Sequence, residues 1–196
     1  MLTGIGGQGI QLAAKTLAVA AIEDGYQSML LGHYAGAMRG GQTDASVVVG
    51  DGPLRVLPIL PATWSAMAMD PAYWEPTKER VRPGGVIVAN SSLVSDVDRA
   101  DCQTFMIPAS GMADEMSAPM SAGYILLGAY AAITGLVSVD ALVAAMRKLV
   151  PPYRTQHLET NEKAIRAGAA AAPALAAPAW VDASVAGATG AVGATA

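Results

Sequence analysis

Hydrophobic residues follow a helical period in some parts of the chain and occur as short runs in others. A brief apolar start at residues 1–3 leads into glycines, and residues 10–22 then carry apolar side chains at helical spacing. Runs of strand length, apolar or β-branched, recur at 27–31, 45–49, 65–69, 86–90 and 104–107. The pattern predicts a strand, a glycine turn and a helix, followed by further strands, of which 86–90 is the clearest buried parallel strand.

Glycine and proline mark the predicted ends of these elements. Gly25 ends the first helix, and Gly50-Asp51-Gly52-Pro53 predicts a turn after the 45–49 strand. Pro83-Gly84-Gly85 predicts a turn before the 86–90 strand, and Asp70-Pro71 predicts a helix with proline at its first position. Short glycine turns between alternating strands and helices predict an α/β fold, an open, mainly parallel sheet with helices on both faces.

The second half of the chain is predominantly helical. Helices are predicted at 124–134, 139–149 and 153–168, and Ser138 is a predicted N-cap for the middle one. From residue 169 the sequence is rich in alanine, proline and glycine; we expect this segment to lie on a neighbouring subunit, with Trp180 as the side chain able to anchor it. We therefore expect an α/β domain at 1–168 and a largely irregular tail at 169–196.

Charge and composition exclude several classes of function. The net charge is −4 and no basic cluster is present, which argues against a nucleic-acid surface. One cysteine, Cys102, and two histidines, His33 and His157, leave no disulfide framework, thiolate cluster or multi-histidine metal centre within this chain. Residues 116–139 lack formal charge, but their dense apolar part is too short for a bilayer crossing, so we expect a buried helix, no membrane span and a cytoplasmic protein.

The first glycine run satisfies G-x-G-x-x-G at Gly4, Gly6 and Gly9. In a strand-to-helix turn, such glycines let backbone N–H groups approach an anion at the helix N-terminus. The acidic residue that would hold a ribose at the end of the second strand is missing, because that strand ends at Leu31-Gly32-His33. Ile10 and Gln11 also replace the Lys and Ser/Thr of a Walker loop. Two readings remain, a phosphate-tolerant loop and glycines that only permit close packing.

Three further groups of residues are candidates for binding. Arg39 beside Gly40 and Gly41 offers a planar donor fork to a phosphate or carboxylate, and it equally suits a pair with Asp44 or a subunit contact. Asn90-Ser91-Ser92 ends the best strand, where ligands of open α/β sheets gather, although such residues also serve as helix caps. Lys15 suits a phosphate contact or a solvated position. No residue is assigned a catalytic role, because the histidines and carboxylates form no recognisable pair.

Taken together, several segments resemble the gamma subunit of 2-oxoacid:acceptor oxidoreductases, a family that includes the pyruvate, 2-oxoglutarate, indolepyruvate and phenylglyoxylate enzymes. The resemblance covers residues 1 to 168. It is carried by Gly4-Ile5-Gly6-Gly7-Gln8-Gly9, Ala14-Lys15, Met38-Arg39-Gly40-Gly41, Ser46-Val47-Val48-Val49, Leu127-Gly128-Ala129 and Leu158-Glu159-Thr160-Asn161-Glu162-Lys163-Ala164.

The resemblance implies a supporting role in the CoA-acylating oxidative decarboxylation of a 2-oxoacid. Thiamine diphosphate and [4Fe-4S] clusters would lie in partner subunits of the alpha, beta and delta types, with electrons leaving to ferredoxin or another acceptor. Residues of this chain would face coenzyme A or the subunit that encloses it: Gly4, Gly6, Gly7, Gln8, Gly9, Lys15, Arg39, Gly40 and Gly41. The alternatives are a stand-alone, Rossmann-like nucleotide-binding oxidoreductase and a purely structural subunit.

Overall fold

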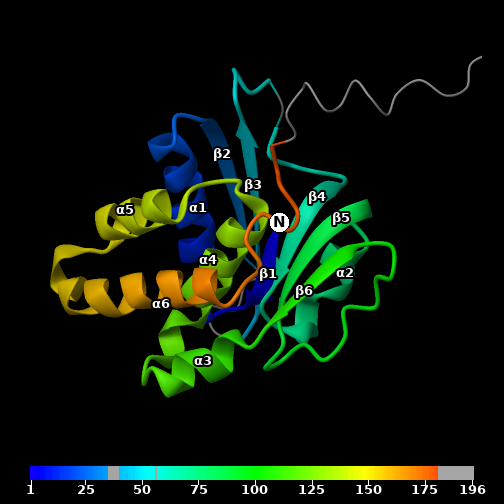
Figure 1. The fold of residues 1–196 in the computed structure, drawn as a ribbon. Helices are drawn as coiled ribbons and strands as arrows, with labels where there is room; N and C mark the ends of the chain where they lie inside the picture. Colours follow the sequence, from blue (N-terminus) through cyan, green and yellow to red (C-terminus); the bar gives the residue numbers. More distant parts are fainter. Residues whose placement is uncertain (35–39, 56, 181–196) are drawn as a thin grey trace, which may run out of the picture.

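A computed structural model describes residues 1–34, 40–55 and 57–180 of the chain (Figure 1). Strands predominate in the chain up to residue 107, with three in succession after the first helix, and helices follow one another from there on. In chain order the elements are β1 (Leu2–Ile5), α1 (Ile10–Glu23), β2 (Gln27–Tyr34), β3 (Gln42–Gly50), β4 (Thr63–Ala68), η1 (Pro71–Tyr73), α2 (Glu75–Lys78), β5 (Val81–Asn90), β6 (Gln103–Ile107), α3 (Ala109–Glu115), η2 (Pro119–Ser121), α4 (Ala122–Thr134), α5 (Val139–Leu149), η3 (Pro152–His157) and α6 (Leu158–Ala170).

The strands form one six-stranded sheet in the order β2-β3-β1-β4-β5-β6. Strands β1, β4, β5 and β6 pair in parallel, whereas β3 runs antiparallel to both of its neighbours, β1 and β2. The expectation of an open, mainly parallel α/β sheet is therefore confirmed. The reversed strand β3 was not anticipated, because orientation depends on pairing partners rather than on the local pattern.

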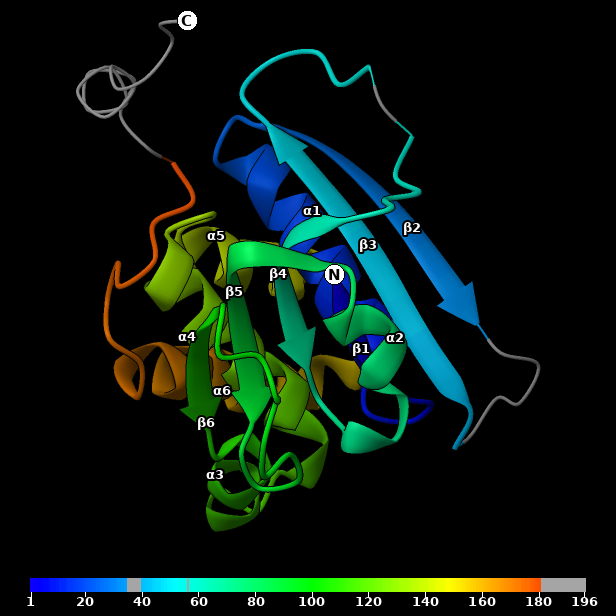
Figure 2. The same ribbon diagram turned by 90° about the vertical axis from the view of Figure 1, so that its right-hand side faces the viewer.

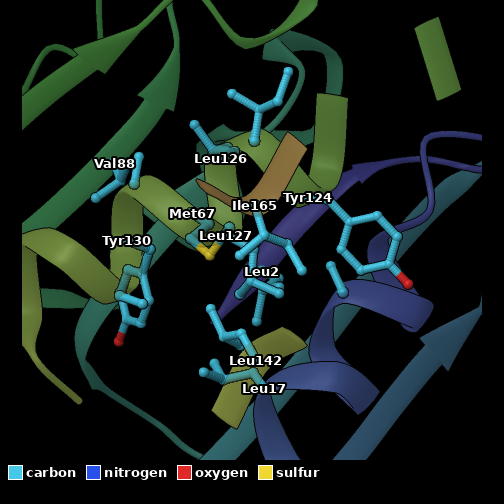
Figure 3. Packing of buried hydrophobic residues seen from close by; sticks show 14 of the residues in the cluster. Leu2, Leu17, Met67, Val88, Tyr124, Leu126, Leu127, Tyr130, Leu142 and Ile165 are labelled. Atoms are coloured by element: carbon cyan, nitrogen blue, oxygen red, sulfur yellow. The ribbon is translucent and has the colours of Figure 1, made fainter. Parts of the chain in front are cut away.

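Most helical mass lies on one face of the sheet, where α1 packs on β2 and β3 and α4 crosses β5 (Figures 1 and 2). The alternation of side chains along each strand divides them between two clusters. Met67 and Val88 point into the larger cluster with the helices, while Ala66 and Ile87 point to the other face, against Trp74 at the start of α2. Figure 3 shows the larger cluster, in which side chains of the sheet meet those of α1, α4, α5 and α6.

Two predicted boundaries are wrong. Pro83-Gly84-Gly85 does not separate two elements but lies inside β5, where Thr63 pairs with Val81 and Ser65 already pairs with Val86. Gly84 has a left-handed φ of 74°, so the predicted turn conformation is present at this residue. The strand nevertheless continues through it with an irregular register. The last helix begins at Leu158, because residues 152–157 form a 3-10 segment with non-helical backbone at Arg154.

After α6, the chain returns along α4. Backbone amides of Leu175, Ala177 and Ala179 donate to carbonyls at the end of α4. Trp180 stacks on Tyr26, with ring centroids 4.4 Å apart, and its indole N–H donates to the Leu136 carbonyl at 3.1 Å. Trp180 thus anchors the 171–180 segment on its own chain, and not on a neighbouring subunit as expected from the sequence. None of the helices in the described ranges combines the length and apolar character required to cross a membrane.

Candidate functional site

The glycine run forms the connection between β1 and α1, at the carboxyl edge of the parallel strands. Gly7 and Gly9 are exposed and have φ values of 111° and 76°, which glycine adopts without the strain of a side chain. Gly9 is the N-cap of α1. Among the residues the structure describes, no acceptor meets the backbone amides of Ile10, Gln11 and Leu12 in the first turn. The loop therefore presents free donors at a helix N-terminus.

The second glycine-rich segment lies directly against the first. The Gly6 amide donates to the Gly41 carbonyl at 2.8 Å, and the Gly40 amide donates back to the Gly6 carbonyl at 3.1 Å. These bonds extend the β1–β3 ladder beyond its last pair, Ile5 with Gln42. Gly40 has a left-handed φ of 73°. The two segments thus form one surface, here called the glycine edge (residues 4–9 and 40–42). Arg39 lies outside the described residues.

Two carboxylates accept hydrogen bonds from side chains in or next to the glycine edge. The Gln8 side-chain amide donates to Asp70 at 3.0 Å, and the buried Thr3 hydroxyl donates to Asp44 at 2.6 Å. Gln42 donates to the other oxygen of Asp44 at 2.6 Å. The bonds of Asp70 to Gln8, 62 residues away, and of Asp44 to Thr3, 41 residues away, depend on tertiary structure, so residue spacing does not predict them. The sequence suggests a pair between Asp44 and Arg39, and this pair involves a residue outside the described ranges.

The remaining candidates have separate environments. Lys15 is exposed on α1 and forms no ion pair with another described residue. Asn90 is fully buried and binds Ser110 twice, accepting from its amide at 3.1 Å and donating to its hydroxyl at 2.9 Å. Its amide also donates to the Met69 carbonyl. Asn90 is therefore a structural link between the ends of β4 and β5 and the start of α3, and it does not cap a helix of its own, because β6 is the next element in the chain.

A cavity of about 230 Å³ lies at the opposite edge of the sheet, near the beginnings of β1 and β4. Its lining includes Val47, Leu60 and the Ser65–Tyr130 pair, whose hydroxyl oxygens are 2.9 Å apart. Burial raises the pKa of Tyr130 to about 12. This edge is away from the carboxyl ends of the parallel strands, where ligands of such sheets bind, and the hydroxyls of Ser65 and Tyr130 already bond to each other.

Within the described residues, no group of three or more His, Cys, Asp or Glu side chains is arranged to hold a metal ion. The thiol of Cys102 is partly buried beside Asp101, and burial raises its pKa above the ordinary value. A raised pKa keeps the thiol protonated, which is opposite to what a nucleophile or metal ligand needs.

Comparison with known proteins gives a consistent result. The model of the pyruvate ferredoxin/flavodoxin oxidoreductase family matches residues 1–171. The 2-oxoglutarate synthase subunit KorC of Methanocaldococcus jannaschii is 30% identical over 154 residues, 76% of this chain and 82% of that protein.

Two solved structures have the same fold. The keto/oxoacid ferredoxin oxidoreductase gamma subunit of Geobacter sulfurreducens superposes with a TM-score of 0.73 at 27% identity, covering 87% of this chain and 95% of that one. The 2-oxoglutarate:ferredoxin oxidoreductase of Magnetococcus marinus, with 2-oxoglutarate, coenzyme A and succinyl-CoA bound, gives a TM-score of 0.78 at 21% identity. The match covers 87% of this chain but 30% of that one.

Proposed function

Because this chain belongs to the pyruvate ferredoxin/flavodoxin oxidoreductase family, as the gamma subunit of a 2-oxoacid:ferredoxin oxidoreductase, we propose that its glycine edge contributes to a coenzyme A site completed by partner subunits. The support is the pair of glycine segments joined through Gly6 and Gly41 at the carboxyl edge of the sheet. Coenzyme A is proposed because the related Magnetococcus marinus enzyme has it bound.

The glycine edge has donors that suit the phosphates of coenzyme A. The amides in the first turn of α1 have no acceptor among the described residues, and the helix dipole favours an anion there. Side chains at Gly7 or Gly9 would narrow the approach of such a ligand to the backbone. Lys15 and Arg39 would add positive charge. The carboxylates of Asp44 and Asp70 would repel an anion, so we assign them a structural role. Asp44 accepts hydrogen bonds from Thr3 and Gln42, and Asp70 accepts one from Gln8.

The chemistry of the reaction would belong to the partner subunits, of the alpha, beta and delta types. The 2-oxoacid loses carbon dioxide, its acyl group is transferred to the coenzyme A thiol, and two electrons leave to ferredoxin. Thiamine diphosphate and [4Fe-4S] clusters in those partners would supply the decarboxylation and the electron path. A four-cysteine cluster cannot be built from Cys102 alone. This chain would bind and orient coenzyme A and contribute to assembly.

A purely structural role is the second candidate, favoured by one observation. A Cβ on Gly4 would lie 2.6 Å from the Gln8 side-chain oxygen and 2.9 Å from the end of the Ile10 side chain, so a larger residue would displace one of these side chains, which is a packing reason for glycine at this position. In that case the glycine edge would contact another subunit and no ligand.

Arg39→Ala in the assembled complex distinguishes the two roles. Loss of a charged phosphate contact should raise the KM for coenzyme A about tenfold with kcat largely kept. Arg55→Ala, an exposed arginine beyond the far end of β3, is the matched control and should leave KM unchanged. Loss of assembly in Arg39→Ala with no change in KM would favour the structural role.

The purified chain alone provides a second test. It should show no turnover with 2-oxoacid, coenzyme A and an electron-accepting dye, and it should bind coenzyme A weakly in calorimetry, because much of the site would be missing. Turnover by the isolated chain would favour a stand-alone oxidoreductase instead.

A further inference from the structure

The side chain of Gln8 folds back over its own loop and joins it to a distant strand end. Its oxygen accepts the Ile5 amide at 3.0 Å, and its amide group donates to Asp70, 62 residues away, also at 3.0 Å. We propose that Asp70 is a positioning residue for the glycine loop and acts through Gln8. The effect on coenzyme A expected below rests on the function proposed above.

Hydrogen-bond polarity allows the Gln8 amide only one orientation. An ionised carboxylate accepts and does not donate, whereas the Ile5 N–H donates and does not accept. The Gln8 nitrogen must therefore face Asp70 and its oxygen must face Ile5. A rotation of the amide by 180° would lose both bonds at once, so the pair of contacts locks this side chain.

Asp70 is itself held from the other side. It follows the end of β4, and its second oxygen accepts the Ala72 amide at 3.0 Å, which caps the η1 turn. Both carboxylate oxygens are therefore engaged, one by the turn and one by Gln8. This arrangement fixes the carboxylate to the sheet and, through Gln8, transmits that position to the loop.

The loop has two independent attachments as a result. Gln8 links it to the end of β4, and Gly6 links it to Gly40 and Gly41 before β3. Gly4 leaves the space that the folded Gln8 side chain occupies, since a Cβ there would lie 2.6 Å from the Gln8 oxygen. The two attachments come from opposite sides of β1 in the sheet, because β3 and β4 are its neighbours. Removing one should loosen the segment between them.

Reversal of the polarity of this contact tests the proposal. In Gln8→Glu two carboxylates would face each other, which removes the bond and adds repulsion. In Gln8→Glu with Asp70→Asn, the new amide can donate to the new carboxylate and still accept from Ala72, so the same geometry is restored with the opposite polarity. Asp114→Asn, on the exposed end of α3, is the control, because its carboxylate forms no ion pair with another described residue.

Two measurements are made on the assembled complex: hydrogen exchange of the peptide containing residues 5–9, and the KM for coenzyme A. Gln8→Glu should accelerate exchange about tenfold and raise KM by a similar factor, the double variant should restore both to within about threefold, and the control should change neither. Exchange that is accelerated and restored while KM stays constant supports the positioning role of Asp70 and counts against the coenzyme A site. Unchanged exchange in Gln8→Glu, or a double variant no better than Gln8→Glu, overturns the role of Asp70.

Discussion

Gly128 of α4 lies directly against the backbone carbonyl of Ile165 in α6, because a methyl group at residue 128 would overlap that oxygen. The relationship is reciprocal, since a methyl group at Gly168 of α6 would overlap the carbonyl oxygen of Ile125 in α4. Two glycines on facing helices therefore allow the backbones to touch. Neither contact can be relieved by rotation of a side chain.

Gly128→Ala should destabilise the chain by about 3 kcal/mol or more, at the upper end of the usual cost of overpacking. Urea denaturation followed by circular dichroism measures the effect. Gly111→Ala in α3 is the matched control, because its added methyl group would meet only the Ser92 hydroxyl, at 3.5 Å. That substitution should stabilise the helix by about 0.5 kcal/mol. Equal effects of the two substitutions would contradict the backbone contact.

Ser138→Ala should cost about 1 kcal/mol, the usual effect of a lost N-cap. The Ser138 hydroxyl accepts the Ala141 amide at 3.1 Å and donates to Asp24 at 2.9 Å, so it joins the start of α5 to the end of α1. Ser138→Thr keeps the hydroxyl and should lie within about 0.5 kcal/mol of the native chain. Urea midpoints of the three proteins provide the comparison, and a threonine variant as unstable as the alanine variant would argue against the cap.

Alkaline pH should destabilise the chain through Tyr130. Its pKa is raised from 10.0 to about 12 by burial, so the unfolded chain releases the phenolic proton first. The stabilisation that comes from this pKa difference is fully present below pH 10 and is lost as the pH rises towards 12. At pH 11 the loss in the free energy of unfolding is about 1 kcal/mol. Tyr130→Phe should remove this part of the pH dependence, although it also loses the bond to Ser65. Unfolding free energies at pH 8 and pH 11 give the test, and an unchanged slope in the variant would refute it.

Trp180→Ala should release the 171–180 segment without unfolding the domain. The substitution removes the stack on Tyr26, worth about 1 kcal/mol beyond its buried area, and the bond to Leu136. Faster hydrogen exchange is expected at Leu175 and Ala177, whose amides donate to α4. Trp180→Phe keeps a stacking ring and should show a smaller increase. Exchange at native rates in the alanine variant would show that the segment is held by its backbone bonds alone.

Features defined within a few residues were predictable from the sequence. The helix at 139–149 and its Ser138 cap depend on local spacing, and both are confirmed. The strand–glycine–helix start is confirmed for the same reason. The predicted turn at Pro83-Gly84-Gly85 is wrong, because a residue with turn geometry can equally form a bulge when partner strands continue on either side.

The candidate site could be predicted only in part. Both glycine segments were identified, but their contact through Gly6 and Gly41 requires the orientation of β3, which no local pattern specifies. Asp70 was read as the start of a helix, and it does cap η1. Its second partner, Gln8, is 62 residues away, so that bond depends on the order of strands in the sheet rather than on spacing.

Because β3 runs antiparallel to β1, its first residue, Gln42, lies beside Ile5 at the end of β1. Had β3 run alongside β1 in the same direction, its first residues would lie at the far end of β1, a strand length from Gly6. The reversal means that a fragment ending at β2 would carry the first half of this edge and lack its counterpart. Complementation of such a fragment by a separately expressed remainder would have to rebuild the ladder between β1 and β3 before any ligand could meet both halves.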